Sequence, residues 1–392
     1  MHVLHVNASL DPVTGGGTAA RTSSLCRALS RSGTGTSVLT LDIGLEPGVA
    51  AAVGETDIIA LRCLNRRFYV PEPAQARVRA AVASADIVHL SGHWTVLNGL
   101  AYRAARRQGT PHVVTPAGAL PIYGRSARLK QHYNRLVGAA LVGTAAAHIA
   151  ITREEVADFS SYGVPSHSVT VIPNGVSPQE FTQPVQAAEA ELSARLGHDP
   201  RPYLLFMGRL NPIKGPDLLL AAVARVRDQL GDLRVVFAGP DEGMAAHLRD
   251  QARSAGLSDR VAFLGSVQGA VKVAAYRRAQ LLVVPSRHEA MSLVALEAGA
   301  SAVPVLLTDV CGFPEVEQFD GGRVVPATVE GLSHGLRELL SRRDQLPQMG
   351  RSLQRLVCSD YSWERAAGSH LELYQSLVGR PDGPVHNAQE QA

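Results

Sequence analysis

Two acidic residues, Glu289 and Glu297, belong to the segment E-A-M-S-L-V-A-L-E, which follows an apolar run ending in Pro-Ser. The pattern predicts a buried strand, a turn, and a helix that begins near Ala290. The helical rise would set the two carboxylates on the order of 12 Å apart, on roughly the same side. The paired carboxylates of a glycoside hydrolase stand about 5–9.5 Å apart, so this spacing favours two contacts with one long ligand.

The backbone between the two glutamates is expected to form an anion site. The N–H groups of Ala290, Met291 and Ser292 would point outward at the positive end of the helix dipole, where a diphosphate binds well. A nucleotide-sugar fits this arrangement, because its sugar hydroxyls, diphosphate and ribose hydroxyls follow one another in that order. The alternative for this segment alone is a pair of surface glutamates on an ordinary helix.

A second segment, G-R-L-N-P-I-K-G, follows the apolar run 203–207 and precedes a helical pattern from Leu218. It places Arg209 and Lys214 on a glycine-flanked loop at the end of a predicted strand. Arg offers a planar fork to phosphate oxygens, and Lys a compact charge. The chain has only three lysines among its 38 basic residues. A lysine at this position therefore indicates that the site requires a compact charge and not a guanidinium group. The alternative is a solvated loop with unrelated charges.

A glycine run, Gly15–Gly17, follows the first apolar run across a loop and precedes a helical pattern from Thr18. Glycines at such a place let backbone N–H groups approach a phosphate closely. An ordinary loop is the alternative for this run when it is considered alone.

Several motifs follow one another in the order found in a known family. Besides the segments above, they are V-I-P-N-G-V (171–176), V-F-A-G-P (236–240), V-A-F-L-G (261–265), D-V-C-G-F-P-E-V (309–316) and Y-S-W-E-R-A (361–366). The chain resembles the retaining glycosyltransferases of family 4, which have the GT-B fold. Within that family it is nearest to the bacterial transferases that build polysaccharides and lipopolysaccharides.

The resemblance implies an α/β fold with two doubly wound Rossmann-like domains that face each other across a cleft. It implies an enzyme that moves a hexose-type sugar from a nucleoside-diphosphate-sugar, a UDP- or GDP-sugar, to a hydroxyl acceptor with retention. Catalysis falls to Glu289, Arg209 and Lys214, with Glu289 on the donor sugar and Glu297 on the ribose. Donor binding falls to Gly16, Gly17, Gly239, Ala290, Met291, Ser292 and Glu297.

The first half departs from the family pattern at two places. Where many members have a T-P-H-G-like segment, this chain has Ala117 in T-P-A-G, and H-L-S-G-H-W stands where relatives often have H-x-H-G-x-W. Ser91 and His93 are therefore candidates for contact with the acceptor, and no general base is assigned. A same-face displacement, in which the leaving phosphate oxygen takes the acceptor proton, needs positioning and charge stabilisation instead of a base.

Apolar runs alternate with helical patterns in both halves, which predicts doubly wound parallel sheets. Residues 1–178 form the acceptor-side domain, 179–200 a linker with several prolines, and 201–360 the nucleotide-sugar-binding domain. A helix over 361–378 returns to the first domain in the family. The polar tail 379–392 has a composition typical of disorder.

Composition fits a cytoplasmic enzyme. The four cysteines have no metal or redox spacing, there is no D-x-D, and no cofactor or metal ion is expected. The opening M-H-V-L-H-V-N predicts a strand and not a signal peptide, and no apolar run is long enough to span a membrane. A formal net charge of +3 does not indicate a nucleic-acid partner.

Basic residues gather in the first half. The stretch 125–135 contains Arg125, Arg128, Lys130 and Arg135 on a predicted amphipathic helix. Such a helix can lie on an anionic membrane surface, which predicts a peripheral contact at the inner face of the cytoplasmic membrane and a glycan or lipid-linked acceptor. The alternative is a solvated helix face packed on the domain core.

Other functional classes remain open at this stage. The acceptor is alternatively a soluble small molecule, or the chain is a sugar-nucleotide epimerase or a phosphorylase on the same fold. A phosphorylase needs a cofactor lysine segment, and three lysines offer little room for one. A non-catalytic module that binds sugar nucleotides would keep Arg209 and Lys214 but has no need of Glu289.

Overall fold

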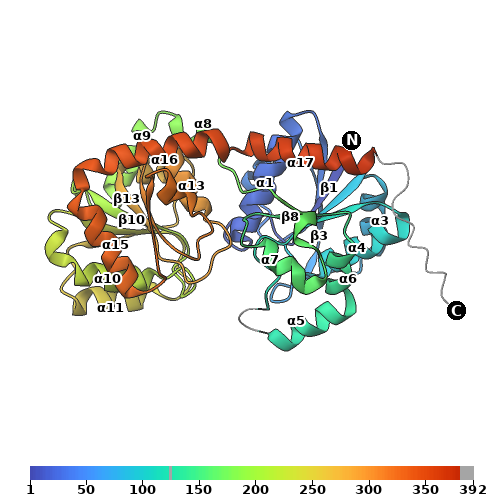
Figure 1. Cartoon of the computed structure of the whole chain (residues 1–392), viewed down its shortest axis with the longest axis horizontal. Coiled ribbons are helices and arrows are strands. Elements are labelled where there is room, and N and C mark those ends of the chain that lie inside the picture. The colour runs from blue at the N-terminus through green and yellow to red at the C-terminus, as the bar shows by residue number, and fades with distance from the viewer. Residues whose placement is uncertain (123–125, 380–392) are drawn as a thin grey trace. The chain divides into compact units, whose positions relative to one another are not determined.

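The computed structural model describes residues 1–122 and 126–379, and the chain divides into two compact units. The first unit is Met1–Ile172 together with the chain from Ala366 onward, and the second is Pro173–Arg365. Each unit contains its own parallel β-sheet with helices packed on both faces (Figure 1). The two sheets confirm the predicted pair of Rossmann-like domains, while the cleft between the domains stays a prediction.

The first unit is built on a seven-stranded sheet with the order β3-β2-β1-β6-β7-β8-β9. Every neighbouring pair is parallel. The inner strands are apolar segments whose side chains are buried on both faces, as such sheets require, whereas the edge strands β3 and β9 are partly exposed. The strands are β1 (His2–Val6), β2 (Gly35–Leu41), β3 (Asp57–Leu61), β6 (Ile87–Ser91), β7 (His112–Thr115), β8 (Ala147–Ala150) and β9 (Val169–Val171). A small antiparallel hairpin joins β4 (Cys63–Asn65) to β5 (Val70–Pro71).

Helices of the first unit cover the sheet in two groups. One apolar core includes side chains of α3, α4, α6 and α7, and a smaller one includes Cys26 of α1 with Leu10, Val38 and Val53. The helices are α1 (Gly16–Arg31), α2 (Pro47–Ala51), α3 (Gln75–Ala83), α4 (Val96–Gln108), α5 (Ala127–Tyr133), the π-helical turn η1 (Asn134–Gly138), α6 (Ala139–Gly143) and α7 (Val156–Phe159). The 3₁₀ turns are η2 (Ser160–Tyr162) and η3 (Ser166–Ser168).

The last described helix, α17 (Trp363–Val378; red in Figure 1), packs on the first unit through buried polar side chains. Tyr374 is hydrogen-bonded to Nδ1 of His89 at 2.5 Å, and the rings of His370 and His5 lie 5.7 and 5.1 Å from that of His89. Arg21 of α1 is buried in the same region. Burial and this guanidinium lower the pKa of His5 and of His370 to about 3, so both rings are neutral at pH 7.

The second unit is built on a six-stranded parallel sheet with the order β12-β11-β10-β13-β14-β15. Its strands are β10 (Tyr203–Met207), β11 (Arg234–Ala238), β12 (Val261–Gly265), β13 (Ala279–Val284), β14 (Val305–Thr308) and β15 (Gly322–Val325). Helix α10 contacts α11 and α15, whereas α9 contacts α12 and α13 contacts α8 and α16. The helices are α8 (Pro178–Thr182), α9 (Gln186–Arg195), α10 (Pro216–Arg225), α11 (Ala245–Ser254), α12 (Gly269–Arg278), α13 (Leu293–Ala300), α14 (Glu315–Gln318), α15 (Val329–Ser341) and α16 (Leu346–Asp360), with 3₁₀ turns η4 (Arg227–Gln229) and η5 (Arg343–Gln345).

Two local expectations differ from the structure. The segment 179–200, expected as a linker, contains most of α8 and all of α9, because Phe181 and Leu192 bury their side chains in the second unit. The helix expected from Ala290 begins at Leu293, because Ser292 is still extended and its N–H donates to the Cys311 carbonyl at 3.0 Å. The expected disordered tail lies, apart from Gly379, outside the described residues, as does Arg125. Within the described residues, none of the helices combines the length and apolar character that a membrane span requires.

Candidate functional site

The predicted residues of the second unit gather where its strand order reverses. The strands β10 and β13 are neighbours at the centre of the sheet, and the connections that follow them run to opposite sides. The carboxyl ends of two such strands form the usual ligand site of an open parallel sheet. Arg209 and Lys214 follow β10, and Glu289 follows β13. The sequence motifs therefore meet at one point of this unit.

Gly215 lets the loop after β10 pack directly on the end of β13. Its φ of 67° is left-handed, and a Cβ at this position would collide with the carbonyl oxygen of Pro285. This close approach places the Lys214 ammonium 2.9 Å from a carboxylate oxygen of Glu289. The other carboxylate oxygen accepts a hydrogen bond from the Ser286 hydroxyl at 2.8 Å.

The Lys214–Glu289 pair is partly open to solvent, with 24% and 12% of the two side chains exposed. The Lys214 backbone N–H donates to the side-chain oxygen of Asn211 at 2.9 Å, which fixes the turn that presents the ammonium group. A lysine and a carboxylate at this position can serve opposite parts of one ligand, the first a phosphate oxygen and the second sugar hydroxyls. The structure thus brings two of the three predicted catalytic residues into contact.

Arg209, the third, is held by a residue that the sequence analysis missed. Its guanidinium donates to Glu242 at 3.1 Å, and the Asn211 amide donates to the other oxygen of the same carboxylate at 2.7 Å. Glu242 follows β11, the next strand in the sheet. The acidic D-E pair directly after V-F-A-G-P was the available signal, since it stands where a parallel strand ends.

Glu297 lies on α13 and faces α12. Its carboxylate accepts hydrogen bonds of 2.7 Å from both the Lys272 ammonium and the Tyr276 hydroxyl. Burial and the neighbouring carboxylate raise the pKa of Tyr276 well above its ordinary value, so the phenol stays protonated and donates. Lys272 and Tyr276 are additional residues that the sequence motifs do not single out, although Lys272 is one of only three lysines.

The backbone positions predicted to bind the donor divide into two groups. The N–H of Gly239 donates to the Gly265 carbonyl at 2.7 Å, and a Cβ there would collide with the Gly208 carbonyl oxygen, so this glycine serves strand packing. Met291 and Ser292 are buried, and Ala290 is half-buried before the helix. Because α13 begins at Leu293 and the Ser292 N–H donates to Cys311, the free N–H groups of the helix are those of its first turn from Leu293 onward. Donor contact by the N–H groups of Ala290 and Met291 stays a prediction.

The first unit repeats this arrangement. The neighbours β1 and β6 mark the reversal of its strand order, and the predicted glycines and acceptor-side residues follow these two strands. Gly16 and Gly17 form the first turn of α1, two residues earlier than the expected start at Thr18, and Gly16 has a φ of 56°. Ser91 ends β6 and is buried, like His93 two residues later.

His93 is fully enclosed and supports other side chains. Its Nε2–H donates to the Asn134 side-chain oxygen at 2.8 Å, and the Asn134 amide donates to the Tyr162 hydroxyl at 2.8 Å. Burial lowers the pKa of His93 to about 4, so the ring is neutral at pH 7. The side chain therefore lies behind Asn134 and Tyr162, which themselves line a pocket.

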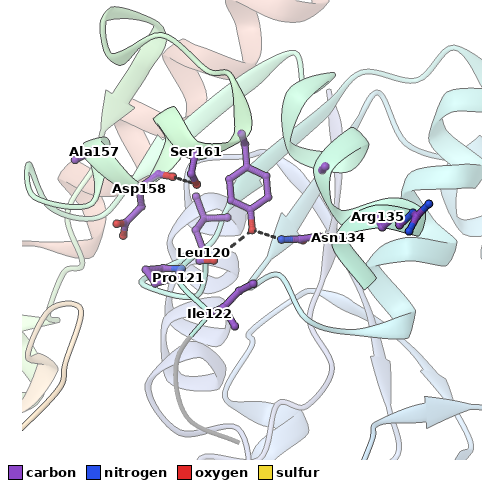
Figure 2. A pocket seen from close by; sticks show the side chains of 10 residues that line it. Leu120, Pro121, Ile122, Asn134, Arg135, Ala157, Asp158 and Ser161 are labelled. Atoms are coloured by element: carbon purple, nitrogen blue, oxygen red, sulfur yellow. Dashed lines mark hydrogen bonds between the residues drawn. The ribbon is translucent and has the colours of Figure 1, made fainter. Parts of the chain in front are cut away.

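This pocket has a volume of about 650 Å³ and lies entirely within the first unit. Its aliphatic lining comes from Leu120, Pro121 and Ile122 after β7, Ala139 of α6 and Ala157 of α7. Its polar lining comes from Asn134, Arg135, Asp158, Ser161 and Tyr162. Figure 2 shows Arg135 and Asp158 on opposite sides of Leu120 and Pro121.

Comparison with known proteins shows the family to which the chain belongs. Residues 16–175 match the family described as "Glycosyl transferase 4-like domain", and residues 189–355 match "Glycosyl transferases group 1". A relative named D-inositol 3-phosphate glycosyltransferase, from Salinispora arenicola (strain CNS-205), is 30% identical over 325 residues, which are 78% of this chain and 71% of the relative.

Two solved structures have a similar fold at low identity. One is Anabaena Alr3699/HepE in complex with UDP and glucose, with a TM-score of 0.78, 18% identity, and coverage of 96% of this chain and 100% of that one. The other is WaaG, described as a glycosyltransferase involved in lipopolysaccharide biosynthesis, with a TM-score of 0.68, 18% identity and coverage of 96% and 100%. With both halves matched in the same order as the two sheets, the chain belongs to the group 1, family 4 glycosyltransferases of GT-B fold.

Proposed function

We propose that this glycosyltransferase takes its sugar from a nucleoside-diphosphate-sugar, a UDP- or GDP-sugar, and transfers it with retention and without a metal ion. One observation carries the proposal: Arg209, Lys214 and Glu289 meet at the strand reversal of the second unit, and Glu297 stands eight residues further on α13. The HepE structures named for bound UDP and UDP-glucose support a uridine donor.

Each group has a distinct task in this proposal. Arg209, Lys214 and the first turn of α13 bind the diphosphate and stabilise the charge that grows on it. Glu289 accepts hydrogen bonds from donor-sugar hydroxyls, and Glu297 from the ribose. The bond from the anomeric carbon to the phosphate oxygen breaks, the acceptor oxygen bonds to that carbon on the same face, and the acceptor proton passes to the leaving phosphate oxygen.

The direct test combines donor binding with product analysis. Thermal shift with UDP-, GDP- and ADP-sugars identifies the donor, since a ligand at 100 times its Kd adds about 2.7 kcal/mol of stability. Proton NMR of the product then gives the anomeric configuration. An inverted product would contradict retention, and release of free nucleotide without an acceptor, together with an altered free sugar, would favour an epimerase instead.

For the acceptor we propose a glycan or lipid-linked intermediate reached at an anionic membrane surface. Leu129 and Leu136 are 53% and 62% exposed, and Arg128 and Arg135 follow the same seven-residue spacing on α5 and η1. Aliphatic and basic residues on one solvent-facing helix suit the interface of an anionic bilayer. Lys130 is less available for contact with anionic lipid, because its ammonium group lies 5.3 Å from the centre of the Trp94 ring.

Sedimentation with anionic vesicles at low salt tests the membrane contact. Arg125, Arg128, Lys130 and Arg135 are changed together to Gln, and Leu129 and Leu136 to Ser in a second variant. Each basic residue near the surface is worth about 1 kcal/mol, so the first variant should lose weak, salt-sensitive binding. Equal sedimentation of the wild type and both variants would show that the basic helix is solvated and does not bind the membrane.

The second candidate is a soluble small-molecule acceptor. It is favoured by the relatives named D-inositol 3-phosphate glycosyltransferase, of which the first covers 78% of this chain. Transfer from the identified donor to inositol phosphates in detergent-free solution, at the same rate with and without vesicles, would support this candidate. Transfer that requires a lipid-linked acceptor would exclude it.

A further inference from the structure

The pocket of the first unit contains none of the residues assigned to donor binding, and its lining is mainly aliphatic. Three of its polar side chains are already hydrogen-bonded within the protein. The Asn134 oxygen accepts from His93 and its amide donates to Tyr162, the Tyr162 hydroxyl donates to the Leu120 carbonyl at 3.2 Å, and the Ser161 hydroxyl donates to the Asp158 carbonyl at 2.8 Å. A sugar ring would find few partners for its hydroxyls in this interior. An aliphatic chain needs none.

The remaining interior surface is aliphatic. Leu120, Pro121 and Ile122 line it from the segment after β7, and Ala139 and Ala157 line it with small side chains from α6 and α7. The volume of about 650 Å³ lies within the range of roughly 300–1,000 Å³ usual for small-molecule pockets. Ile122 is itself 41% exposed, so the apolar lining continues to the molecular surface.

The shape of this wall depends on the π-helical turn η1. A π-turn inserts one residue into a helix and often marks a functional site. Here it turns Asn134 toward His93 and Tyr162, and Gly138 makes room for it, because a Cβ at that position would collide with the Asn134 side-chain oxygen. The same turn carries Arg135 at the edge of the pocket and the exposed Leu136 beside it.

Charge distinguishes the two edges of the pocket. Arg135 is exposed and, among the residues that the structure describes, forms no ion pair, whereas Asp158 lies on the α7 side (Figure 2). An anionic head group therefore suits the Arg135 edge, where Arg128 lies two helical turns away on the same helix. The chemistry of the pocket is that of an aliphatic chain headed by a phosphate.

We propose that this pocket binds the first part of the aliphatic chain of a lipid-phosphate acceptor, with its phosphate beside Arg135. The inference rests on the proposed function, because it assumes that the acceptor is lipid-linked. The pocket would then hold the lipid of the acceptor, in addition to the contact of the enzyme with the membrane. In this arrangement the basic helix α5 binds the membrane surface. The pocket beside that helix binds a single lipid molecule from the membrane.

The test uses farnesyl phosphate, below its critical micelle concentration, and isothermal titration calorimetry with the full chain. Ala139→Phe and Ala157→Phe fill the pocket from exposed helix positions, so the fold should be unaffected, and each should weaken binding at least tenfold. Ala140→Phe, the next residue on α6 and not part of the lining, is the matched control and should bind as the wild type does. No binding by the wild type, or equal loss in the control, overturns the proposal.

The head-group assignment has its own pair of variants. Arg135→Gln should weaken farnesyl phosphate binding severalfold, while Arg107→Gln, which changes an exposed arginine of α4 outside the lining, should have little effect. The same Arg135→Gln change should leave the binding of neutral farnesol unchanged, because the alcohol carries no charge. Identical effects of the two arginine changes would show a diffuse surface charge and overturn a phosphate site at Arg135.

A third arm separates the acceptor from bulk membrane lipid. Dihexanoyl phosphatidylglycerol, also below its critical micelle concentration, should bind much more weakly than farnesyl phosphate, and equal affinity would overturn the acceptor assignment. UDP-sugar binding is measured in the same variants and should not change. If wild type binds UDP-sugars but not farnesyl phosphate, the pocket inference fails alone; if it binds neither UDP- nor GDP-sugars, the proposed function fails.

Discussion

The Lys272 ammonium group donates a hydrogen bond of 2.7 Å to the Glu297 carboxylate, just as Lys214 donates one of 2.9 Å to Glu289. Two of the three lysines of an arginine-rich chain are thus paired with the two glutamates of one motif. A lysine ammonium can exchange its partner by rotation about a flexible stem, whereas a guanidinium fork is held by its planar geometry. The pairs hold both carboxylates in place until ligand hydroxyls reach them.

The two glutamates should separate sugar recognition from nucleotide recognition. Glu297→Gln is expected to weaken both the donor and the free nucleoside diphosphate, because the ribose is common to both. Glu289→Gln should spare nucleoside diphosphate binding and abolish transfer. Calorimetry with the donor's nucleoside diphosphate, beside a transfer assay, measures both effects. Equal losses of nucleoside diphosphate affinity in the two variants would contradict this division.

The two cations of the β10 loop should act on the leaving diphosphate. Arg209→Ala and Lys214→Ala are each expected to lower kcat by about 10²-fold or more, since each removes charge stabilisation that a ligand-facing donor supplies. Activity should persist in EDTA at wild-type level. Loss of activity on chelation, with recovery on adding magnesium or manganese, would show that a metal ion shares this charge.

Glu242 should act as a positioning residue for Arg209. Glu242→Gln keeps the shape but removes the charge that holds the guanidinium, so we expect a severalfold fall in kcat with little change in KM. Glu330→Gln is the matched control, because Glu330 also pairs with an arginine, Arg225, on the surface and away from the β10 loop. Similar kinetics in the two variants would mean that Arg209 needs no such support.

The buried histidines should make the first unit sensitive to acid. The pKa values of His5 and His370 are lowered to about 3, chiefly by burial and then by Arg21, and burial also lowers that of His89. Between about pH 6.5 and pH 3 the unfolded chain therefore binds more protons than the folded one. The free energy of unfolding is at its full value above pH 6.5 and falls as the pH drops through this window.

Each of these histidines contributes a slope approaching about 1.4 kcal/mol per pH unit well below pH 6.5. Chemical unfolding followed by circular dichroism at pH 7.5 and pH 5 measures the difference, and His370→Gln should reduce it. The exposed His167→Gln is the control and should leave the slope as it is. A slope that does not respond to His370→Gln would assign the acid sensitivity to other groups.

The sequence predicts the large features of this molecule because parallel strands carry continuous apolar runs. The runs at Val3, Ile87, Tyr203 and Leu281 all became central strands, and the motif residues that follow them gathered at the reversals of strand order. By contrast, β15 has only four residues, two of them half-buried, and leaves a pattern too short to recognise.

Contacts between segments that lie far apart in the chain could not be predicted from the sequence. The link from Glu242 to Arg209 joins two strands through loops whose conformations depend on Gly208 and Gly239, and spacing alone gives no sign of it. The start of α13 was misplaced because Ser292 prefers a hydrogen bond to Cys311, a residue from the next strand connection. His93 stands in a segment that departs from a family motif, and its hydrogen-bond partners Asn134 and Tyr162 belong to none of the motifs.

The division of the chain into two units has a consequence for the order of synthesis. All seven strands of the first sheet are complete by Val171, but the helix that supplies Tyr374 and His370 is translated only after the second unit. Domains normally fold as they leave the ribosome, the N-terminal one first. Here the nascent first sheet must wait, with His5 and His89 uncovered, while the whole of the second unit is translated. The first unit is therefore the first to begin folding, but it is completed only after the second unit has been synthesised.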